Sequence, residues 1–273
     1  MTTSTPQAAF LGEPGPPEPE PHPRPAPEAR PPRRPGHVAA AVLSALLGTG
    51  LLAGAAATAW SEHRAAHRPL PPDAAYRQAA SLWRSAPVDS LFPPVLDGPE
   101  AGPGGAARSW TRTALAPDAD CGAALAPDWR AALAAAGCTR VLRATYTDST
   151  RSSLITVGLV FTPADSATMD GLRGRLPAPP AYAYADTRRA AWSTAVVAGA
   201  PVLVYTVSAF ADGRSMDAPV PAEEAAAQGA TGVVAEAGLG YEAKALAARF
   251  ERGLATLAAP PASTPPPTAT AAR

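Results

Sequence analysis

The sequence is poor in the side chains that most often perform chemistry. It has four histidines, and all of them precede residue 69: His22, His37, His63 and His67. It has no asparagine, one lysine (Lys244) and one isoleucine (Ile155). A C-terminal part without histidine has no Ser-His-Asp triad, no Cys-His dyad and no His-ligated metal site. These absences exclude the commonest routes to hydrolysis and metal catalysis from that part of the chain.

Neither sign of charge is in excess, because 23 Lys and Arg residues balance 23 Asp and Glu residues. A protein that binds nucleic acid non-specifically needs a basic surplus to neutralise phosphates. We therefore expect no nucleic-acid partner. Only 6% of residues are aromatic, so the core should consist mostly of Leu, Val and Ala. The length of 273 residues is typical of one or two domains.

One long apolar run dominates the N-terminal part of the chain. Residues 38–60 are 23 consecutive uncharged positions. As a helix they would span about 34 Å, enough to cross the ~30 Å hydrocarbon core of a bilayer. Trp60 stands where an interfacial aromatic residue is expected. The run predicts one transmembrane helix, with the lipid bilayer as its partner and the plasma membrane as its location.

The arginines around this run indicate its orientation. Four precede it and three follow it: Arg24, Arg30, Arg33 and Arg34, then Arg64, Arg68 and Arg77. The positive-inside rule favours a cytoplasmic N-terminus and an extracytoplasmic C-terminal domain. The alternative is a cleaved signal peptide, because residues 57–59 match a small-x-small cleavage site. Cleavage after Ala59 would make the protein secreted, but the long N-terminal tail and the length of the run favour an uncleaved anchor.

Proline-rich segments precede the predicted helix and end the chain. Residues 1–37 contain 12 prolines and predict a disordered cytoplasmic tail. The alternative is that this tail is a ligand for a Pro-binding partner, because residues 16–19 match a PxxP motif. Residues 61–107 predict a juxtamembrane helix followed by a Pro/Gly linker. Residues 258–273 predict a second disordered tail, rich in Pro and Thr.

Residues 108–257 have the patterns of a folded extracytoplasmic domain, in which period-2 alternation predicts strands and 3.6-residue periodicity predicts helices. The strands are predicted at 109–115, 139–147, 153–161, 191–197 and 201–210, and the helices at 127–136, 162–176 and 239–257. This order favours an α+β fold, an antiparallel sheet with helices packed on one face. Over residues 108–198 the order βαββαβ also matches the ferredoxin-like arrangement, extended by an added strand and a C-terminal helix.

The only two cysteines, Cys121 and Cys138, both lie in this domain. An even number is typical of a disulfide in an oxidising compartment, and closing such a loop stabilises a fold by roughly 3 kcal/mol. The rival interpretations are a metal pair and a redox pair. Zinc needs about four ligands and no histidine lies nearby, while the spacing is not that of a CxxC motif. We therefore predict a structural disulfide.

Gly50 and Gly54 form a GxxxG motif inside the predicted transmembrane helix. Such small residues let two helices approach closely, so the motif would form a helix-dimer face. Chance is the alternative explanation in a segment this rich in Ala and Gly.

The residue types that remain in the domain predict no catalytic, cofactor-binding or metal-binding site. Lys244 could serve a Ser–Lys dyad, but a solvated helix position is favoured. Residues 238–240 (Gly-Leu-Gly) could bind an anion at a helix start, although a turn and cap is favoured, and a solvated pair is favoured for Arg188 and Arg189. The carboxylates lie mostly in predicted turns, where they usually cap backbone: Asp118, Asp120, Asp148, Asp186, Asp212, Asp217, Glu223, Glu224 and Glu236.

Several segments together resemble a class of single-pass membrane proteins from Streptomyces-type actinobacteria. They are the Pro-rich tail, the Ala/Gly/Leu anchor, residues 138–146 (Cys-Thr-Arg-Val-Leu-Arg-Ala-Thr-Tyr), which follow Cys121, and the turn at residues 211–214 (Ala-Asp-Gly-Arg). The resemblance implies no activity, cofactor or catalytic residue.

Three hypotheses about function follow from these patterns. The first is a non-enzymatic, membrane-anchored extracytoplasmic module that binds a ligand or partner, or assists one, at the cell envelope. The second is a small carboxylate- or Ser-dependent envelope hydrolase, which requires a cleft with convergent acids and at least one raised pKa. The third is an assembly protein that dimerises through Gly50 and Gly54.

Overall fold

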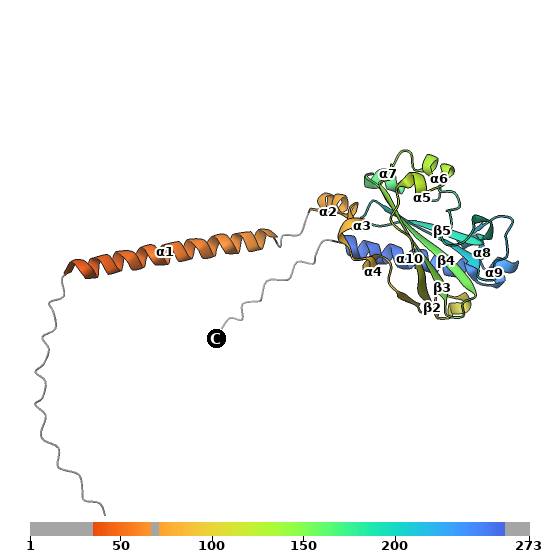
Figure 1. Ribbon diagram of the computed structural model, residues 1–273, viewed down its shortest axis with the longest axis horizontal. Helices are drawn as coiled ribbons and strands as arrows, with labels where there is room; N and C mark the ends of the chain where they lie inside the picture. Colours follow the sequence, from red (N-terminus) through yellow and green to blue (C-terminus); the bar gives the residue numbers. More distant parts are fainter. Residues whose placement is uncertain (1–34, 67–70, 260–273) are drawn as a thin grey trace, which may run out of the picture. The chain divides into compact units, whose positions relative to one another are not determined.

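The computed structural model describes residues 35–66 and 71–259, and the chain divides into two units after Ala66. The described part of the first unit is one helix, and that of the second is a sheet covered by helices (Figure 1). Most of the two predicted Pro-rich tails lies outside the described residues.

Helix α1 (Pro35–Ala66) contains the predicted transmembrane run. Its stretch Ala40–Ala65 covers 26 residues with a mean hydropathy of 1.8, which is long and apolar enough to cross a membrane. The helix begins before the predicted run of residues 38–60 and ends after it. Thr49 Oγ1 donates to the carbonyl oxygen of Ala45 at 2.8 Å, and this local bond satisfies the hydroxyl within the helix itself.

The second unit is built on one seven-stranded sheet with the order β1-β2-β3-β4-β6-β5-β7. The strands are β1 (Val95–Gly98), β2 (Arg108–Leu115), β3 (Arg140–Asp148), β4 (Ser153–Phe161), β5 (Ala191–Val196), β6 (Val202–Phe210) and β7 (Val220–Pro221). Neighbouring strands are antiparallel except β5 and β7, which are parallel over two residues. The strands predicted at 139–147 and 153–161 pair with each other as β3 and β4, and those predicted at 191–197 and 201–210 pair as β5 and β6.

One face of this sheet is covered by the long C-terminal helix α10 (Leu239–Ala258), which runs along the strands (Figure 1). The side chains of β4 that point toward it are apolar and fully buried: Ile155, Val157, Leu159 and Phe161. The Phe250 ring on α10 lies 5.8 Å from the ring of Tyr146 and 5.7 Å from that of Phe92. Thr206 Oγ1 on β6 donates to the carbonyl oxygen of Ala243 at 2.7 Å. The C-terminal helix predicted from periodicity is therefore confirmed, although Leu257 at its end is 38% exposed.

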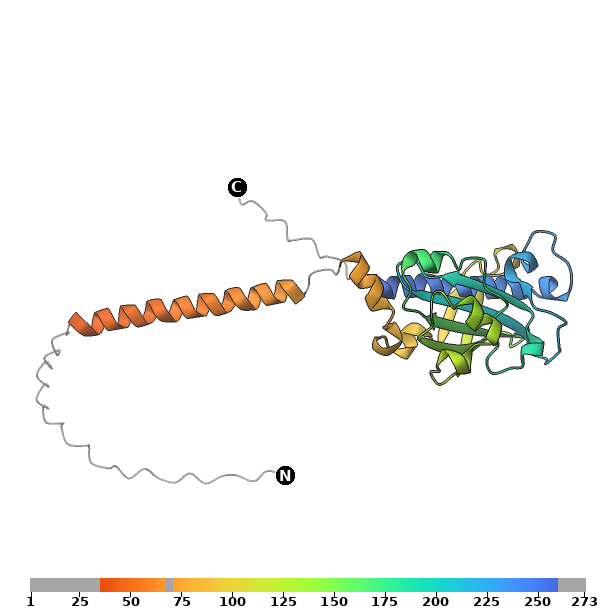
Figure 2. The ribbon, with the colours of Figure 1, turned by 90° about the horizontal axis from the view of Figure 1, so that it is seen from above.

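The opposite face is covered by three short helices, α5 (Cys121–Ala124), α6 (Pro127–Ala132) and α7 (Ser166–Asp170) (Figure 2). Trp129 on α6 is fully buried, and its ring lies 5.2 Å from that of Tyr205 on β6. The indole nitrogen of Trp129 donates to the carbonyl oxygen of Pro177 at 3.1 Å. Helices α6 and α7 are shorter than the predicted 127–136 and 162–176.

The prediction of helices on one face is therefore wrong. The alternation along β3 and β4 indicates one apolar face. The second face of the sheet is also buried, because Trp129 and Met169 from the connecting segments pack against it. The ferredoxin-like order is not formed either. Strands β2 and β3, which flank α5 and α6, are antiparallel neighbours, so the helical segment between them does not make a crossover between parallel strands.

The segment predicted as a juxtamembrane helix and linker belongs largely to the folded unit. It forms α2 (Pro72–Ala79), α3 (Leu82–Ser85), α4 (Val88–Leu91) and then β1, which adds an edge strand to the sheet. Leu91, Phe92 and Leu96 are buried in the main core. The domain boundary expected at residue 108 therefore falls inside the unit. Two further short helices, α8 (Ala222–Ala225) and α9 (Val233–Glu236), follow β7.

The predicted disulfide is confirmed, because Cys121 and Cys138 are bonded with their Cα atoms 6.1 Å apart. The bond joins the start of α5 to the chain just before β3. It therefore closes the connection between the β2 and β3 neighbours on the face covered by α6.

Candidate binding groove

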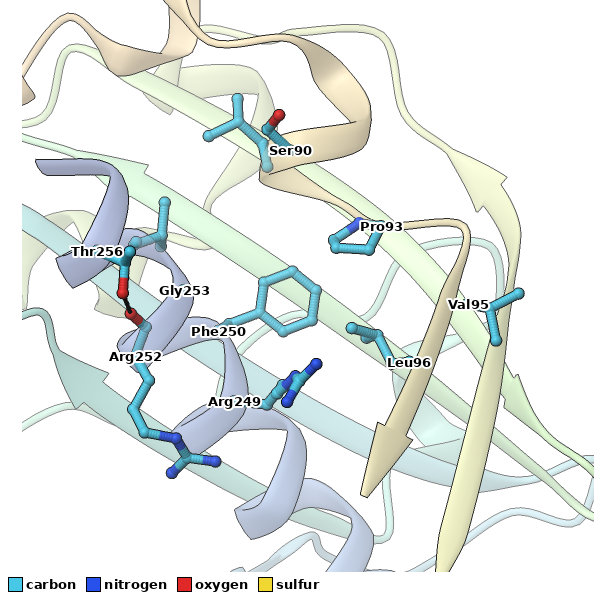
Figure 3. Close-up of a pocket in the computed structure, with 11 residues that line it drawn as sticks. Ser90, Pro93, Val95, Leu96, Arg249, Phe250, Arg252, Gly253 and Thr256 are labelled. Carbon is cyan, nitrogen blue, oxygen red and sulfur yellow. Dashed lines mark hydrogen bonds between the residues drawn. The ribbon is translucent and has the colours of Figure 1, made fainter. Parts of the chain in front are cut away.

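A hollow of about 320 Å³ lies between α10 and residues 90–96 (Figure 3). Its floor is apolar, because Leu91, Leu96, Phe250 and Leu254 line it and are buried in the core below. The helical spacing of Phe250 and Leu254 turns both into the core, and it turns the intervening Arg252 and Gly253 toward solvent.

The wall opposite α10 is held in place by side chains of the sheet. Arg112 on β2 forms an ion pair with Asp89 at 2.8 Å and donates to the carbonyl oxygen of Phe92. Tyr146 on β3 donates its hydroxyl to the carbonyl oxygen of Pro93 at 3.0 Å. These bonds fix the segment from α4 to β1, so the hollow is preformed.

A second hollow of about 470 Å³ continues along α10, between Tyr241–Arg252 of the helix and residues 97–101. Arg249 and Arg252 line both hollows. We refer to the two together as the α10–β1 groove, bounded by residues 90–101 on one side and 241–256 on the other. Figure 3 shows Arg249 and Phe250 projecting from α10 toward Leu96.

The first hollow of the groove is positively charged. Arg249 and Arg252 are exposed, and its lining contains no carboxylate. Within residues 35–66 and 71–259, neither guanidinium has an ion pair or a hydrogen bond. In the second hollow Asp97 and Glu100 accompany Lys244. The strongest attraction for an anion is therefore in the first hollow, over its apolar floor.

The outer edge of β1 borders this groove and offers unpaired backbone groups. Arg112 N donates to Pro94 O at 2.9 Å, and Leu96 lies opposite Trp110. In an antiparallel pair, every second residue of a strand forms its backbone hydrogen bonds with the neighbouring strand. Pro94 and Leu96 therefore bond to β2, while Val95 and Asp97 direct their N–H and C=O groups outward. In the described part of the chain no strand pairs with that edge, because β1 ends the sheet.

A separate cluster joins two buried acids under the β3–β4 turn. Glu242 on α10 is 3% exposed and accepts a hydrogen bond from Ser153 Oγ at 2.6 Å. Asp148 is equally buried and accepts from the backbone nitrogens of Ser152 and Ser153 at 2.7 and 2.8 Å. Asp148 therefore shapes the turn, as expected of a capping carboxylate.

The pKa values of these two acids move in opposite directions. Burial, helped by the nearby Asp148, raises the pKa of Glu242 to about 7, against the opposing effects of Ser153 and Arg108. Burial also acts to raise the pKa of Asp148, but hydrogen bonds from Thr150, Ser152 and Ser153 outweigh it and lower that pKa. Opposed pKa values are typical of acid–base pairs. A hydrolase also needs a cleft, yet the described hollow that reaches Asp148 is lined by neither Ser153 nor Glu242.

The structure gives local roles to other carboxylates and glycines considered from the sequence. Asp120 caps α5 by accepting from Ala123 N at 2.8 Å, and Asp212 pairs with Arg214 across its turn. Gly238 has φ 74° and caps α10, as favoured for residues 238–240.

The structure also shows the surroundings of the basic residues and of the GxxxG glycines that were considered from the sequence. Arg188 and Arg189 donate to backbone carbonyls of Phe210 and Pro179, both at 2.8 Å, so they brace loops. Lys244 is exposed and lines the second hollow of the groove. A Cβ added at Gly50 or Gly54 meets nothing within 4 Å, so the dimer face stays a prediction.

Arg249, Arg252 and Glu242 were not among the residues predicted to matter. Their signal lies in the periodicity of α10. Glu242 stands three residues after Leu239 and four before Leu246, inside the apolar stripe, while Arg249 lies beside the stripe member Phe250. Among the residues that the structure describes, no group of three or more His, Cys, Asp or Glu side chains could hold a metal ion.

Comparisons with known proteins find no match: no protein-family model, no curated protein and no solved structure is significantly similar to this chain.

Proposed function

We propose that this is a single-pass plasma-membrane protein whose extracytoplasmic α+β domain binds an anionic ligand or partner in the α10–β1 groove and does not act as an enzyme. The observation that carries the proposal is the pair of exposed, unpaired guanidinium groups of Arg249 and Arg252 above a preformed apolar floor. A ligand that fits this surface carries a negative charge next to an apolar part.

The location of the domain is supported by two independent features. The stretch Ala40–Ala65 is long and apolar enough to anchor the chain, and the arginines before it favour a cytoplasmic N-terminus. The Cys121–Cys138 disulfide is typical of a domain that faces an oxidising compartment. Both features favour an anchored domain outside the cytoplasm.

The proposal is tested by calorimetric titration of the full chain in nonionic micelles with naphthalene-2-sulfonate, a probe that joins an anionic group to an apolar ring. We expect saturable binding that the double variant Arg249→Gln/Arg252→Gln weakens about tenfold, because two charge-assisted contacts are lost. The control is Arg130→Gln/Arg175→Gln, which removes the same charge from exposed positions away from the groove. Equal binding by both double variants would overturn the proposed site.

One observation favours a second function, an envelope hydrolase: the carboxyl groups of Asp148 and Glu242 converge on Ser153 with opposed pKa values. All three side chains are buried, so a substrate would reach them only if the β3–β4 turn moved away from α10. The test is hydrolysis of p-nitrophenyl acetate by the full chain. A rate that Glu242→Gln abolishes would favour this function over binding.

A further inference from the structure

We propose that the occupant of the α10–β1 groove is an extended acidic peptide segment that adds as a strand to the free edge of β1. This inference rests on the proposed binding function and names its partner class. Two independent properties of the groove support it. One is the row of outward backbone groups on β1, and the other is the position of Arg249 and Arg252 beside that strand.

The backbone groups define the conformation of the partner. Val95 and Asp97 each direct an N–H and a C=O to the outer edge, as the register with β2 requires. An extended chain can satisfy all four groups at once, and strand addition of this kind is a recurring mode of peptide recognition. Val95 is 58% exposed, and within residues 71–259 no strand pairs with this edge, because β1 ends the sheet. The opposite edge of the sheet is the two-residue β7, which ends in Pro221 and cannot act as a comparable template.

Strand alternation decides which partner residues face α10. Leu96 points into the core beneath Phe250, so the partner residue opposite Leu96 also points toward α10 and is apolar. The residues two positions before and after it lie opposite Pro94 and Gly98, on the same face. These residues are the ones that reach Arg249 and Arg252, which line the groove together with Leu96 and Gly98. The partner pattern is therefore acid-x-apolar-x-acid.

The two partner residues between the acids and the apolar residue should not be acidic. They lie opposite Val95 and Asp97, on the face of the sheet that points away from α10. The Asp97 side chain is exposed on that strand, so an acid placed opposite it would be repelled. A shift of one residue in the pattern therefore both removes the acids from the two arginines and places one beside Asp97.

The experiment measures fluorescence anisotropy of labelled, end-capped peptides with the full chain in nonionic micelles. The test peptide is Glu-Thr-Val-Thr-Glu, and the register control is Thr-Glu-Val-Glu-Thr, which has the same composition and charge. We expect the test peptide to bind about tenfold more tightly than the control, because only it places its acids on the α10 face. Methylation of the backbone nitrogens of both Thr residues removes two strand-to-strand hydrogen bonds, and we expect it to weaken binding about tenfold.

The outcomes separate this inference from the proposed function. Equal affinity for the two registers, or no effect of N-methylation, would overturn strand addition. If naphthalene-2-sulfonate still bound in an Arg249- and Arg252-dependent way, the groove would remain an anion site with a different occupant. A requirement for phosphatidylglycerol in nanodiscs, with no peptide binding, would identify that occupant as a lipid headgroup. Loss of both probe binding and peptide binding would overturn the proposed function as well.

Discussion

The buried carboxyl group of Glu242 should make the stability of the domain depend on pH near neutrality. Its neighbours come from three strands of the sheet: Ser153 on β4, which donates a hydrogen bond, Asp148 on β3, and Arg108 on β2. The substitution Glu242→Gln keeps the size of the side chain and an oxygen that can accept a hydrogen bond from Ser153, but it removes the ionisation.

The magnitude follows from the pKa of Glu242, which rises from an ordinary value of 4.5 to about 7, chiefly through burial. The unfolded chain loses this proton above pH 4.5, whereas the folded chain keeps it until about pH 7. The stability that the group contributes is therefore complete below pH 4.5, falls as pH rises, and is gone above about pH 7. At about 1.4 kcal/mol for each unit of pKa difference, the total loss is roughly 3 kcal/mol.

The assay is thermal unfolding of the full chain in nonionic micelles between pH 4.5 and 8.5, followed by tryptophan fluorescence. We expect the variant Glu242→Gln to match the wild type at pH 4.5 and to melt about 6–12 °C higher at pH 8, since 1 kcal/mol corresponds to about 2–4 °C in a domain of this size. The control Glu236→Gln changes an exposed acid and should leave the wild-type pH dependence intact.

A wild-type melting temperature that stays constant from pH 4.5 to 7.5 would refute this reasoning. So would an unchanged pH slope in Glu242→Gln, because the slope would then belong to another group. Asp148 cannot imitate the effect, since its pKa is lowered and its contribution is lost as pH falls rather than as it rises.

Three further predictions concern packing, the disulfide and topology. Gly158→Ala should destabilise the domain by about 1–3 kcal/mol, because the added Cβ would clash with the ring of Tyr205. Gly253→Ala, whose added Cβ meets nothing within 4 Å, should stabilise α10 by about 0.5–1 kcal/mol. Urea unfolding of the two variants measures both effects. Reduction of Cys121–Cys138, 17 residues apart, should lower the free energy of unfolding by about 3 kcal/mol, and an unchanged urea midpoint would contradict this. Protease added to intact spheroplasts should digest the C-terminal domain and spare an N-terminal tag; release of the domain into the medium would instead indicate cleavage after Ala59.

Elements with strong local patterns could be predicted from the sequence. The apolar run that became α1, the alternation of β3 and β4, and the helical stripe of α10 were all recognised. The disulfide followed from the number of cysteines and their separation. In these cases the residues that define the element are close together in the chain, so the pattern is complete within one segment.

Strand β1 and the second covered face could not be predicted, because long-range contacts define them. Residues 95–98 lie among Pro and Gly residues and read as a linker. They form a strand because Leu96 is buried opposite Trp110 on β2. The second face is buried by Trp129 and by the segment around Met169, which arrive from connections whose direction the sequence does not reveal.

The groove was missed for the same reason. Arg249 and Arg252 look like ordinary solvated residues on α10, and they become a candidate site only because β1 and the preceding segment lie beside that helix. Glu242 could have been recognised, because it lies between Leu239 and Leu246 on the apolar face of the helix. A carboxylate on that face is buried when the face packs against the sheet.

Anion binding between α10 and β1 can be observed residue by residue, by methyl NMR of the full chain in micelles during titration with naphthalene-2-sulfonate. The methyl groups of Leu91, Leu96 and Leu254 line the groove, whereas those of Val160 and Leu203 lie on the opposite face of the sheet. The proposal predicts saturable shifts for the first three and none for the last two. Shifts confined to the opposite face, or no saturable shifts at all, would contradict it.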